Sequence, residues 1–413
     1  MKILHIVAGK LSGGAGRGAY WLHQALIDSG IESLLLTNTK ENIIDEHIIN
    51  INKNFKERVF SIVRNQIDQN ISHLYKKREK LIFSTGLIGF DFTKLQVYKD
   101  ADIIHLHWIN SGMLDIKILQ KIKKPVIWTM RDMWPMTGGC HYTMGCTKFL
   151  ALCGECQQLH SSSKYDLSRL VLQRKLKYLP KTIKIVGISS WLSNEAKKSS
   201  VFQGFDIRTI DNNVNSKEFL PIDKKIAREI LGIKTKKKII LVGASNLKDF
   251  YKGFNKYLEA LKLLDKQKYF LCFFGNSDTE IFDGIGFEYR DFGFLNDTIS
   301  LRLLYSCADV FVAPSLMEAF GKTIVESMSC KTPVVCFDAT GPKDIVRDKI
   351  DGYKAKAFSS RDLASGIEWI VNLDKETYTT LCSSARERVE MKFDSYLIAQ
   401  TYINLYKEVL NGE

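Results

Sequence analysis

The stretch Pro314-Ser-Leu-Met-Glu-Ala-Phe-Gly-Lys-Thr-Ile-Val-Glu326 decides how the rest of the chain is interpreted. It follows a short apolar strand, residues 310–313, and the apolar side chains after it predict that a helix begins near Gly321. Glu318 is then expected in the loop before the helix, and Glu326 at least one turn inside it. This succession of strand, loop and helix predicts a parallel α/β fold.

The backbone amides of Phe320, Gly321 and Lys322 are expected at the free N-terminus of this helix. Unpaired N–H groups and a partial positive charge make such a terminus suitable for a phosphate. With Glu318 before the terminus and Glu326 behind it, the pattern suits a ligand that has hydroxyls on both sides of a diphosphate, as a nucleotide-sugar does. The alternative is an acidic surface loop followed by an ordinary amphipathic helix.

Length and composition bound the class of protein. A chain of 413 residues with 45% apolar and 25% charged residues predicts two globular domains with large cores. The net charge of +13 favours nucleic acid, an anionic membrane or an anionic substrate as partner, and the lack of any nucleic-acid-binding motif places nucleic acid last. The first apolar run is too short for a signal peptide and none is long enough to cross a bilayer, so a cytoplasmic protein is expected.

Alternating strand and helix patterns predict two doubly wound α/β domains. The expected boundaries are a first domain over 1–210, a linker over 211–236, a second domain over 237–390 and a C-terminal segment over 391–413 whose helix packs back on the first domain. In the first domain, strands are expected at 2–7, 33–37, 102–108, 125–129, 183–187 and 205–210. In the second, they are expected at 236–244, 270–274, 288–291, 310–313 and 333–337.

A glycine-rich loop, residues 9–18, follows the first strand and contains Gly13, Gly14 and Gly16. The loop lacks the spacing of the dinucleotide-binding fingerprint. Its glycines would still let backbone N–H groups come close to a ligand, and the alternative is a tight turn without a ligand.

The segment 53–80 is predicted to be a basic amphipathic helix. Its apolar residues recur every four positions from Phe55 to Tyr75, and basic residues outnumber acidic ones along it. Such a helix either lies on an anionic membrane or packs its apolar row into the core with a solvated face outward.

The strand at 102–108 places His105 and His107 on one face, and His107 falls at its carboxyl end, where open α/β sheets bind ligands. The next strand brings Arg131 and Asp132 to the same edge. The alternative for a strand histidine is a hydrogen-bonded core residue.

Four cysteines crowd into one loop and end in a C-x-x-C pair: Cys140, Cys146, Cys153 and Cys156. Four thiols match the ligand count of a tetrahedral structural zinc site, and His141 offers a replacement ligand. The alternatives are free or paired thiols, although a reducing compartment disfavours disulfides. Such a metal would pin the loop and take no part in the chemistry.

The order of motifs resembles the retaining GT-B glycosyltransferases of the glycogen-synthase-like family, glycosyl transferases group 1. The resemblance covers nearly the whole chain and is most specific over residues 237–357, where the shared motifs are Lys252-Gly253, Ala308-Asp309-Val-Phe-Val-Ala-Pro-Ser315, the two glutamates with seven residues between them, Thr332-Pro-Val-Val335 and Gly341 before Ile345. It implies two Rossmann-like domains that face each other across a cleft. The "CHY…C…CGEC" loop is similar to that of a subgroup of bacterial polysaccharide-assembly transferases.

The resemblance also implies roles for single residues. Glu326 would hold the ribose hydroxyls, Glu318 the sugar hydroxyls beside the reacting carbon, and Lys252 the diphosphate, with the amides near Phe320 and Gly321 completing the cradle. His107 would contact the sugar, and Gly13, Gly14 and Gly16 would meet acceptor and phosphate. The chain departs from the family pattern at Asn246, where an arginine is usual and for which nearby Lys248 is the expected substitute, at Arg131, where a histidine is usual, and at Lys331, where a glycine is usual.

The function that follows from the resemblance is transfer of a sugar, with retention and without a catalytic metal, from a nucleotide-sugar to a saccharide acceptor. A lipid-linked saccharide is the expected acceptor, in capsule, exopolysaccharide or lipopolysaccharide assembly at the inner face of the membrane. A nucleotide-sugar epimerase, a carbohydrate phosphorylase and a non-catalytic membrane-associated scaffold are the alternatives.

Overall fold

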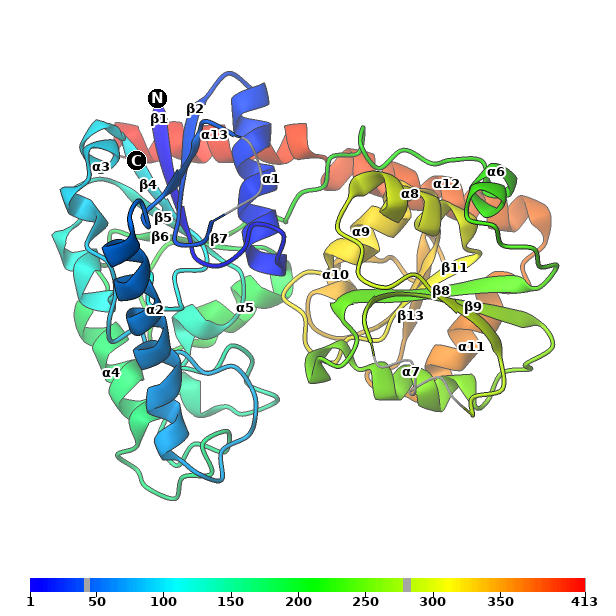
Figure 1. The fold of residues 1–413 in the computed structure, drawn as a ribbon, viewed down its shortest axis with the longest axis horizontal. Coiled ribbons are helices and arrows are strands. Elements are labelled where there is room, and N and C mark those ends of the chain that lie inside the picture. The colour runs from blue at the N-terminus through cyan, green and yellow to red at the C-terminus, as the bar shows by residue number, and fades with distance from the viewer. Residues whose placement is uncertain (41–44, 278–283, 413) are drawn as a thin grey trace. The chain divides into compact units, whose positions relative to one another are not determined.

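A computed structural model describes residues 1–40, 45–277 and 284–412 of the protein. The chain forms two compact units (Figure 1). The first consists of residues 1–211 together with the C-terminal residues from Ala399, and the second of residues 212–398. Within the described residues, no helix combines the length and the apolar character needed to span a bilayer.

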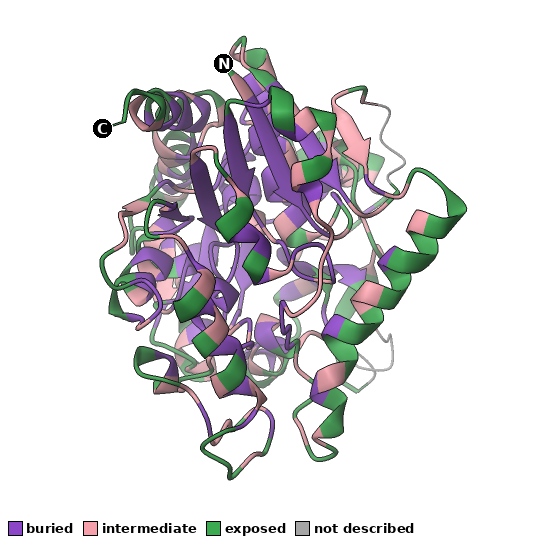
Figure 2. Ribbon diagram, turned by 90° about the vertical axis from the view of Figure 1, so that its left-hand side faces the viewer, coloured by how far each residue is buried: buried purple, intermediate pink, exposed green. Residues whose placement is uncertain are grey.

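The first unit is built on a parallel sheet with the strand order β3-β2-β1-β4-β5-β6-β7. The described strands are β1 (Lys2–Val7), β2 (Glu32–Thr37), β3 (Ile48–Asn50), β4 (Ile103–Leu106), β5 (Val126–Met130), β6 (Lys184–Gly187) and β7 (Ile207–Thr209). The α-helices are α1 (Gly14–Asp28), α2 (Phe55–Asn70), α3 (Gln96–Asp100), α4 (Leu167–Tyr178) and α5 (Ser190–Lys198). The central strands β4 and β5 are buried at every residue and β1 at every residue but Lys2 (Figure 2), which explains why they are largely apolar and show no polar alternation.

The second unit repeats this plan with the strand order β10-β9-β8-β11-β12-β13, again all parallel. Its strands are β8 (Lys238–Asn246), β9 (Tyr269–Asn276), β10 (Glu288–Asp291), β11 (Val310–Ala313), β12 (Val334–Phe337) and β13 (Gly352–Ala355). Its α-helices are α6 (Lys224–Ile230), α7 (Phe254–Leu261), α8 (Thr298–Cys307), α9 (Lys322–Ser329), α10 (Pro342–Ile345), α11 (Ser360–Val371) and α12 (Lys375–Lys392). In both units the strand order reverses beside the first strand, which is the topological switch point of a doubly wound sheet.

The last helix, α13 (Ser395–Asn411), begins in the second unit and continues in the first. Within the first unit, the Tyr406 hydroxyl hydrogen-bonds His105 at 2.6 Å and the Tyr402 hydroxyl lies 2.9 Å from Thr129 Oγ1. The carboxylate of Glu408 pairs with Arg208 on β7. Of the segment 211–236, expected as a linker, residues 212–236 belong to the second unit, where α6 packs against α8.

The prediction of two doubly wound α/β domains is confirmed, but three local expectations need correction. Helix α1 begins at Gly14, so Gly14 and Gly16 are its first-turn residues and not part of a loop. Helix α2 ends at Asn70 and not near residue 80. Its apolar row does not enter the core: Phe55, Val59, Val63 and Ile67 are all exposed. The buried residues of α2 are Ser61 and Asp68.

Candidate functional site

The loop between β11 and α9 holds the first group of predicted site residues. The Lys252 Nζ atom donates a hydrogen bond of 2.7 Å to Glu318 Oε2, and the Ser315 hydroxyl donates one of 3.0 Å to the same oxygen. Both side chains of the ion pair are partly exposed, at 29% for Lys252 and 19% for Glu318. The structure therefore brings together the lysine and the glutamate that the sequence places 66 residues apart.

Close backbone packing fixes this pair. A Cβ atom on Gly253, whose φ is +64°, would lie 2.0 Å from the carbonyl oxygen of Pro314. Only glycine permits that approach, and it lets the amide of Leu316 donate to the Tyr251 carbonyl at 2.8 Å. On the other side, the amide of Gly341 donates to the Glu318 carbonyl at 2.9 Å. The loop that carries Glu318 is thus held between the turn at residues 251–253 on one side and Gly341, just before α10, on the other.

Helix α9 presents its N-terminus to the same hollow. Gly321 is the N-cap residue with φ +127°, and no side chain caps the helix there. The prediction of a helix beginning near Gly321 is confirmed. A pocket beside it is lined by residues from the ends of β8 and β11 and from the first turn of α9, among them Gly243, Lys252, Ser315, Glu318 and Thr323. The Lys252 ammonium group and the Glu318 carboxylate line this pocket with Thr323 from the first turn of α9, and an ammonium group beside a helix N-terminus suits a phosphate.

Glu326 lies deeper than the other predicted residues. Its side chain is buried, and the Tyr305 hydroxyl donates a hydrogen bond of 2.8 Å to its Oε2 atom. Lys248, the expected substitute for the usual arginine, is exposed. Neither Glu326 nor Lys248 lines the pocket around Glu318, whereas Lys252 does.

In the first unit, His107 belongs to a buried cluster with His5 and His105. His5 Nδ1 and His107 Nε2 share a hydrogen bond of 2.8 Å, and His107 Nδ1 lies 3.1 Å from an Arg131 guanidinium nitrogen. Burial, followed by the neighbouring cations and imidazoles, lowers the pKa of all three histidines well below its usual value, so they are neutral at pH 7. The expectation that His105 and His107 share a face is confirmed by ring centroids 4.2 Å apart. Contact of His107 with a sugar would require it to exchange one of these bonds.

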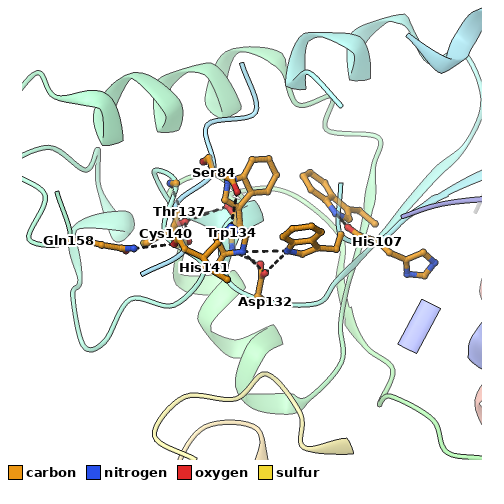
Figure 3. Close-up of polar contacts among 12 residues, drawn as sticks. Ser84, His107, Asp132, Trp134, Thr137, Cys140, His141 and Gln158 are labelled. Atoms are coloured by element: carbon orange, nitrogen blue, oxygen red, sulfur yellow. Dashed lines mark hydrogen bonds and ion pairs between the residues drawn. The ribbon is translucent and has the colours of Figure 1, made fainter. Parts of the chain in front are cut away.

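Asp132 and His141 form a second buried network (Figure 3). The Asp132 Oδ2 atom lies 2.6 Å from His141 Nδ1 and accepts a hydrogen bond of 2.9 Å from the Trp108 indole. His141 Nε2 lies 2.9 Å from the Ser84 hydroxyl. Both ring nitrogens of His141 are thus occupied, which makes it a poor replacement for a cysteine ligand.

A cavity of about 600 Å³ opens at the carboxyl ends of β1, β2 and β3, beside α2. Its lining is rich in amides and cations and contains no carboxylate: Gly9, Asn38, Thr39, Lys40, Asn50, Asn52, Lys53, Arg58, Ser61, Ile62, Asn65 and Ser111. The cavity was not predicted, because its residues come from four separate segments without a shared motif. It suits a polyhydroxylated ligand that carries negative charge.

The predicted glycines of the first unit do not line this cavity. A Cβ atom on Gly16 would lie 2.3 Å from the Lys10 carbonyl oxygen, so Gly16 allows α1 to pack against the preceding loop. Gly13 is the N-cap of α1, and Gly14 has open space around its Cα. The four clustered cysteines are free thiols that line a common small pocket.

Comparison with known proteins shows that the second unit resembles a known protein family. Residues 223–388 match the family of glycosyl transferases group 1. Over these residues the second unit is similar to that family. Lys252, Glu318 and the N-terminus of α9 all lie within the matched residues.

Relatives and solved structures extend the likeness. The chain is 26% identical over 207 residues to the N,N'-diacetylbacillosaminyl-diphospho-undecaprenol alpha-1,3-N-acetylgalactosaminyltransferase of Campylobacter jejuni, an alignment that covers 48% of this chain and spans about half (53%) of that enzyme's length. The sucrose-phosphate synthase of Thermosynechococcus elongatus superposes with a TM-score of 0.71 at 20% identity, covering 100% of both chains. Anabaena HepE in complex with UDP-glucose superposes with a TM-score of 0.64 at 15% identity, covering 100% of both chains. The two units have the GT-B fold, as predicted.

Proposed function

We propose that this protein is a retaining glycosyltransferase that moves a hexose-type sugar from a nucleotide-sugar to a saccharide acceptor in the assembly of a bacterial surface polysaccharide. The observation that carries the proposal is the Lys252–Glu318 pair at the free N-terminus of α9, within the residues that match glycosyl transferases group 1. The alternatives of an epimerase, a phosphorylase or a scaffold have no comparable support.

The proposed chemistry follows from the charges that develop in the reaction. Cleavage of a sugar–diphosphate bond leaves negative charge on the departing phosphate and positive charge on the sugar ring. The ammonium group of Lys252 and the amides of α9 lie where they stabilise the phosphate, which makes a divalent metal unnecessary in the proposed step. Glu318 binds the sugar hydroxyls, and the leaving phosphate accepts the proton of the attacking hydroxyl on the same face. Glu326 is proposed to bind the ribose after exchanging its bond with Tyr305.

The cavity beside α2 is the proposed acceptor site. Its four asparagines match the hydroxyls of a saccharide, and Lys53 and Arg58 match a phosphate or another acid. Neither cation forms an ion pair with another described residue, so both charges are available to a ligand. Because the Campylobacter relative is named for an undecaprenol-diphosphate-linked substrate, we propose a lipid-diphosphate-linked saccharide as the acceptor class.

An anionic membrane surface is the proposed location of that acceptor. Helix α2 turns its large apolar side chains away from the core, with Phe55 78%, Phe60 62% and Ile62 56% exposed. Figure 2 shows α2 as the long helix at the right, with most of its outward ribbon coloured as exposed. The buried Asp68 carboxylate holds the opposite side of the helix by accepting hydrogen bonds from the amides of Thr85 (3.0 Å) and Gly86 (2.8 Å). An apolar outer face flanked by basic residues matches an interfacial helix on anionic lipid.

Thermal unfolding in the presence of a panel of nucleotide-sugars tests the proposed function. A donor that binds the native state alone raises the melting temperature, by an amount that grows with its concentration over Kd. The expected result is a shift with one nucleotide class and none with the free sugar. Incubation of that nucleotide-sugar without acceptor should leave the sugar configuration unchanged, whereas an epimerase would invert a centre. No shift with any nucleotide-sugar would contradict the proposal.

A further inference from the structure

The cysteine loop has the construction of a metal site that lies apart from the proposed reaction. Its four thiols come from the segment 140–156, which includes Phe149 and lines a pocket together with Phe83 and Ser168 at the start of α4. No aspartate or glutamate lines the pocket that they share. Among the described residues, a different set, His5, His105 and His107, has its ligand atoms within 4.8 Å of one another, and no three of the four cysteine sulfurs lie that close together. Zinc–sulfur bonds of about 2.3 Å place the sulfurs roughly 3.8 Å apart, so the sulfurs in this structure are more widely spaced than in a zinc site.

Backbone amides point at the cysteine sulfurs. Burial raises the pKa of the Cys153 and Cys156 thiols, and it is opposed by the backbone amide of Gly138 at Cys153 and by those of Leu159 and Gln158 at Cys156. Left-handed backbone at Cys153 (φ +52°), Gly154 (φ +101°) and Glu155 (φ +45°) makes the sharp turn that allows this. Donated N–H groups favour a thiolate over a thiol, and non-glycine residues accept positive φ only where the surroundings demand it.

A buried cation lies behind the loop. Lys175 on α4 is fully buried, and its Nζ atom donates to the carbonyl oxygens of Trp134 and Thr137 (2.8 Å for Thr137) and lies 3.7 Å from the centre of the Trp134 ring. It forms no ion pair with any carboxylate among the described residues. Among the groups that can carry a negative charge, Cys140 and Cys153 act most strongly on Lys175. Burial lowers the pKa of Lys175 to about 7, so the Lys175 amine is a buried basic group next to the thiol pocket with no carboxylate partner in the part of the chain that the structure describes.

We infer that Cys140, Cys146, Cys153 and Cys156 bind one zinc ion as thiolates, and that Lys175 offsets one of the negative charges of the cluster. Each Zn–S bond forms as the thiol proton leaves to solvent, so one Zn²⁺ replaces four protons and the cluster carries two negative charges. Binding draws the sulfurs together and closes the loop. The histidine set is disfavoured, because its ring nitrogens bond Tyr406, Thr129 and Arg131 and the Arg131 cation would repel a metal.

Metal analysis of the full chain, purified under reducing conditions without a metal-affinity tag, tests the inference. The expected content is about one zinc per chain. The double variant Cys153→Ser/Cys156→Ser should contain less than about a tenth of that amount. The control variant Cys382→Ala removes a buried cysteine of the second unit and should keep the full content. Cobalt exchanged into the wild-type chain should show the sulfur-to-metal charge-transfer band of a tetrahedral thiolate site.

Two further measurements test zinc binding even if the double variant does not fold. Chelation of the wild-type chain should lower its melting temperature by about 5 °C or more, and added zinc should restore it. Lys175→Met should weaken zinc retention against a chelator by about tenfold or more, because the cluster loses an offsetting positive charge. A wild-type chain without stoichiometric zinc, a cobalt spectrum without a thiolate band, or four thiols that react freely with a thiol reagent in the folded protein would overturn the inference.

Discussion

Lys252 and Glu318 neutralise each other across 2.7 Å at the N-terminus of α9. Each group is the proposed partner of a different part of the donor, so binding of a nucleotide-sugar has to exchange this ion pair for two new contacts. The pair is partly exposed, and an exposed pair of this kind contributes about 1 kcal/mol or less to stability. The exchange therefore costs little, and the pair keeps both side chains positioned before the donor arrives.

Removal of the Lys252 ammonium group should weaken stabilisation of the leaving phosphate. We expect Lys252→Ala to lower kcat/KM for the donor by about 10² to 10³, the usual effect of deleting one charge-stabilising donor. Steady-state kinetics with the identified nucleotide-sugar measure this. Lys256→Ala is the control, because Lys256 forms a similar ion pair with Glu259 at 2.9 Å outside the pocket. Equal losses in the two variants would show that Lys252 has no specific role.

The outward face of α2 should bind anionic lipid. We expect Phe55→Ser/Phe60→Ser to reduce co-sedimentation with vesicles of phosphatidylcholine and phosphatidylglycerol by about tenfold or more, because two exposed apolar side chains are lost. Wild-type binding should also weaken with added salt, which screens the basic residues. Ile299→Ser, which changes an isoleucine that is 70% exposed on α8, is the control. Equal binding by the two variants, or a lipid-free dimer that only the α2 variant disrupts, would contradict the membrane proposal.

Asp309 of the Ala308-Asp309 motif should be structural. Its carboxylate accepts from Lys224 at 2.9 Å, Arg228 at 2.8 Å and the Ile239 amide at 2.7 Å. Burial opposes ionisation of this group, but the two cations and the amide outweigh burial and hold the pKa of Asp309 below its usual value. The stabilisation is therefore complete above the unfolded-state pKa of about 4 and is lost as the pH falls through the lower folded-state value.

Asp309→Asn should accordingly lower the free energy of unfolding by about 2 to 3 kcal/mol at pH 7 and flatten the loss of stability below pH 4. Denaturant titrations at several pH values measure this. The exposed pair Asp338–Lys354 supplies the control, since Asp338→Asn should change stability by about 1 kcal/mol or less. If the free energy of unfolding falls below pH 4 in the same way in Asp309→Asn as in the wild type, Asp309 is not the source of the pH dependence.

Lys331 takes the left-handed conformation at the end of α9, with φ +61°, at the position where the family pattern has glycine. A side chain in this conformation costs about 1 kcal/mol. We expect Lys331→Gly to raise the free energy of unfolding by about 0.5 to 1 kcal/mol, measured by denaturant titration with donor affinity unchanged. A loss of stability would mean that the lysine side chain makes a compensating contact.

The sequence predicts the parts of the fold that local pattern controls. Strands β10 and β11 have the predicted bounds because turn residues close each of these short segments. The short strands β3 and β13 were not predicted, because three or four residues of mixed polarity give no periodic signal. The outward direction of the α2 apolar row could not be predicted either, since it depends on the contacts of Asp68 with Thr85 and Gly86 and not on spacing within the helix.

In the candidate site, too, features set by a local motif could be predicted and features that depend on tertiary contacts could not. The position of Glu318 before a helix that begins after Gly321 could be predicted, because both belong to one local motif. The contact of Glu318 with Lys252 depends on the approach of Gly253 to Pro314, and the bond between Glu326 and Tyr305 joins two helices. The acceptor cavity collects residues from four segments, so it becomes visible only in the folded unit.

The most direct test of the central claim compares sugar transfer and donor binding in Glu318→Gln. Transfer of a labelled sugar from the identified nucleotide-sugar to a lipid-diphosphate-linked saccharide gives kcat, and calorimetric titration of the same nucleotide-sugar gives Kd. The account predicts that kcat falls by about 10³ or more while Kd changes by less than about threefold, because the glutamate acts on the sugar and not on the nucleotide. Transfer by Glu318→Gln at the wild-type rate would contradict it.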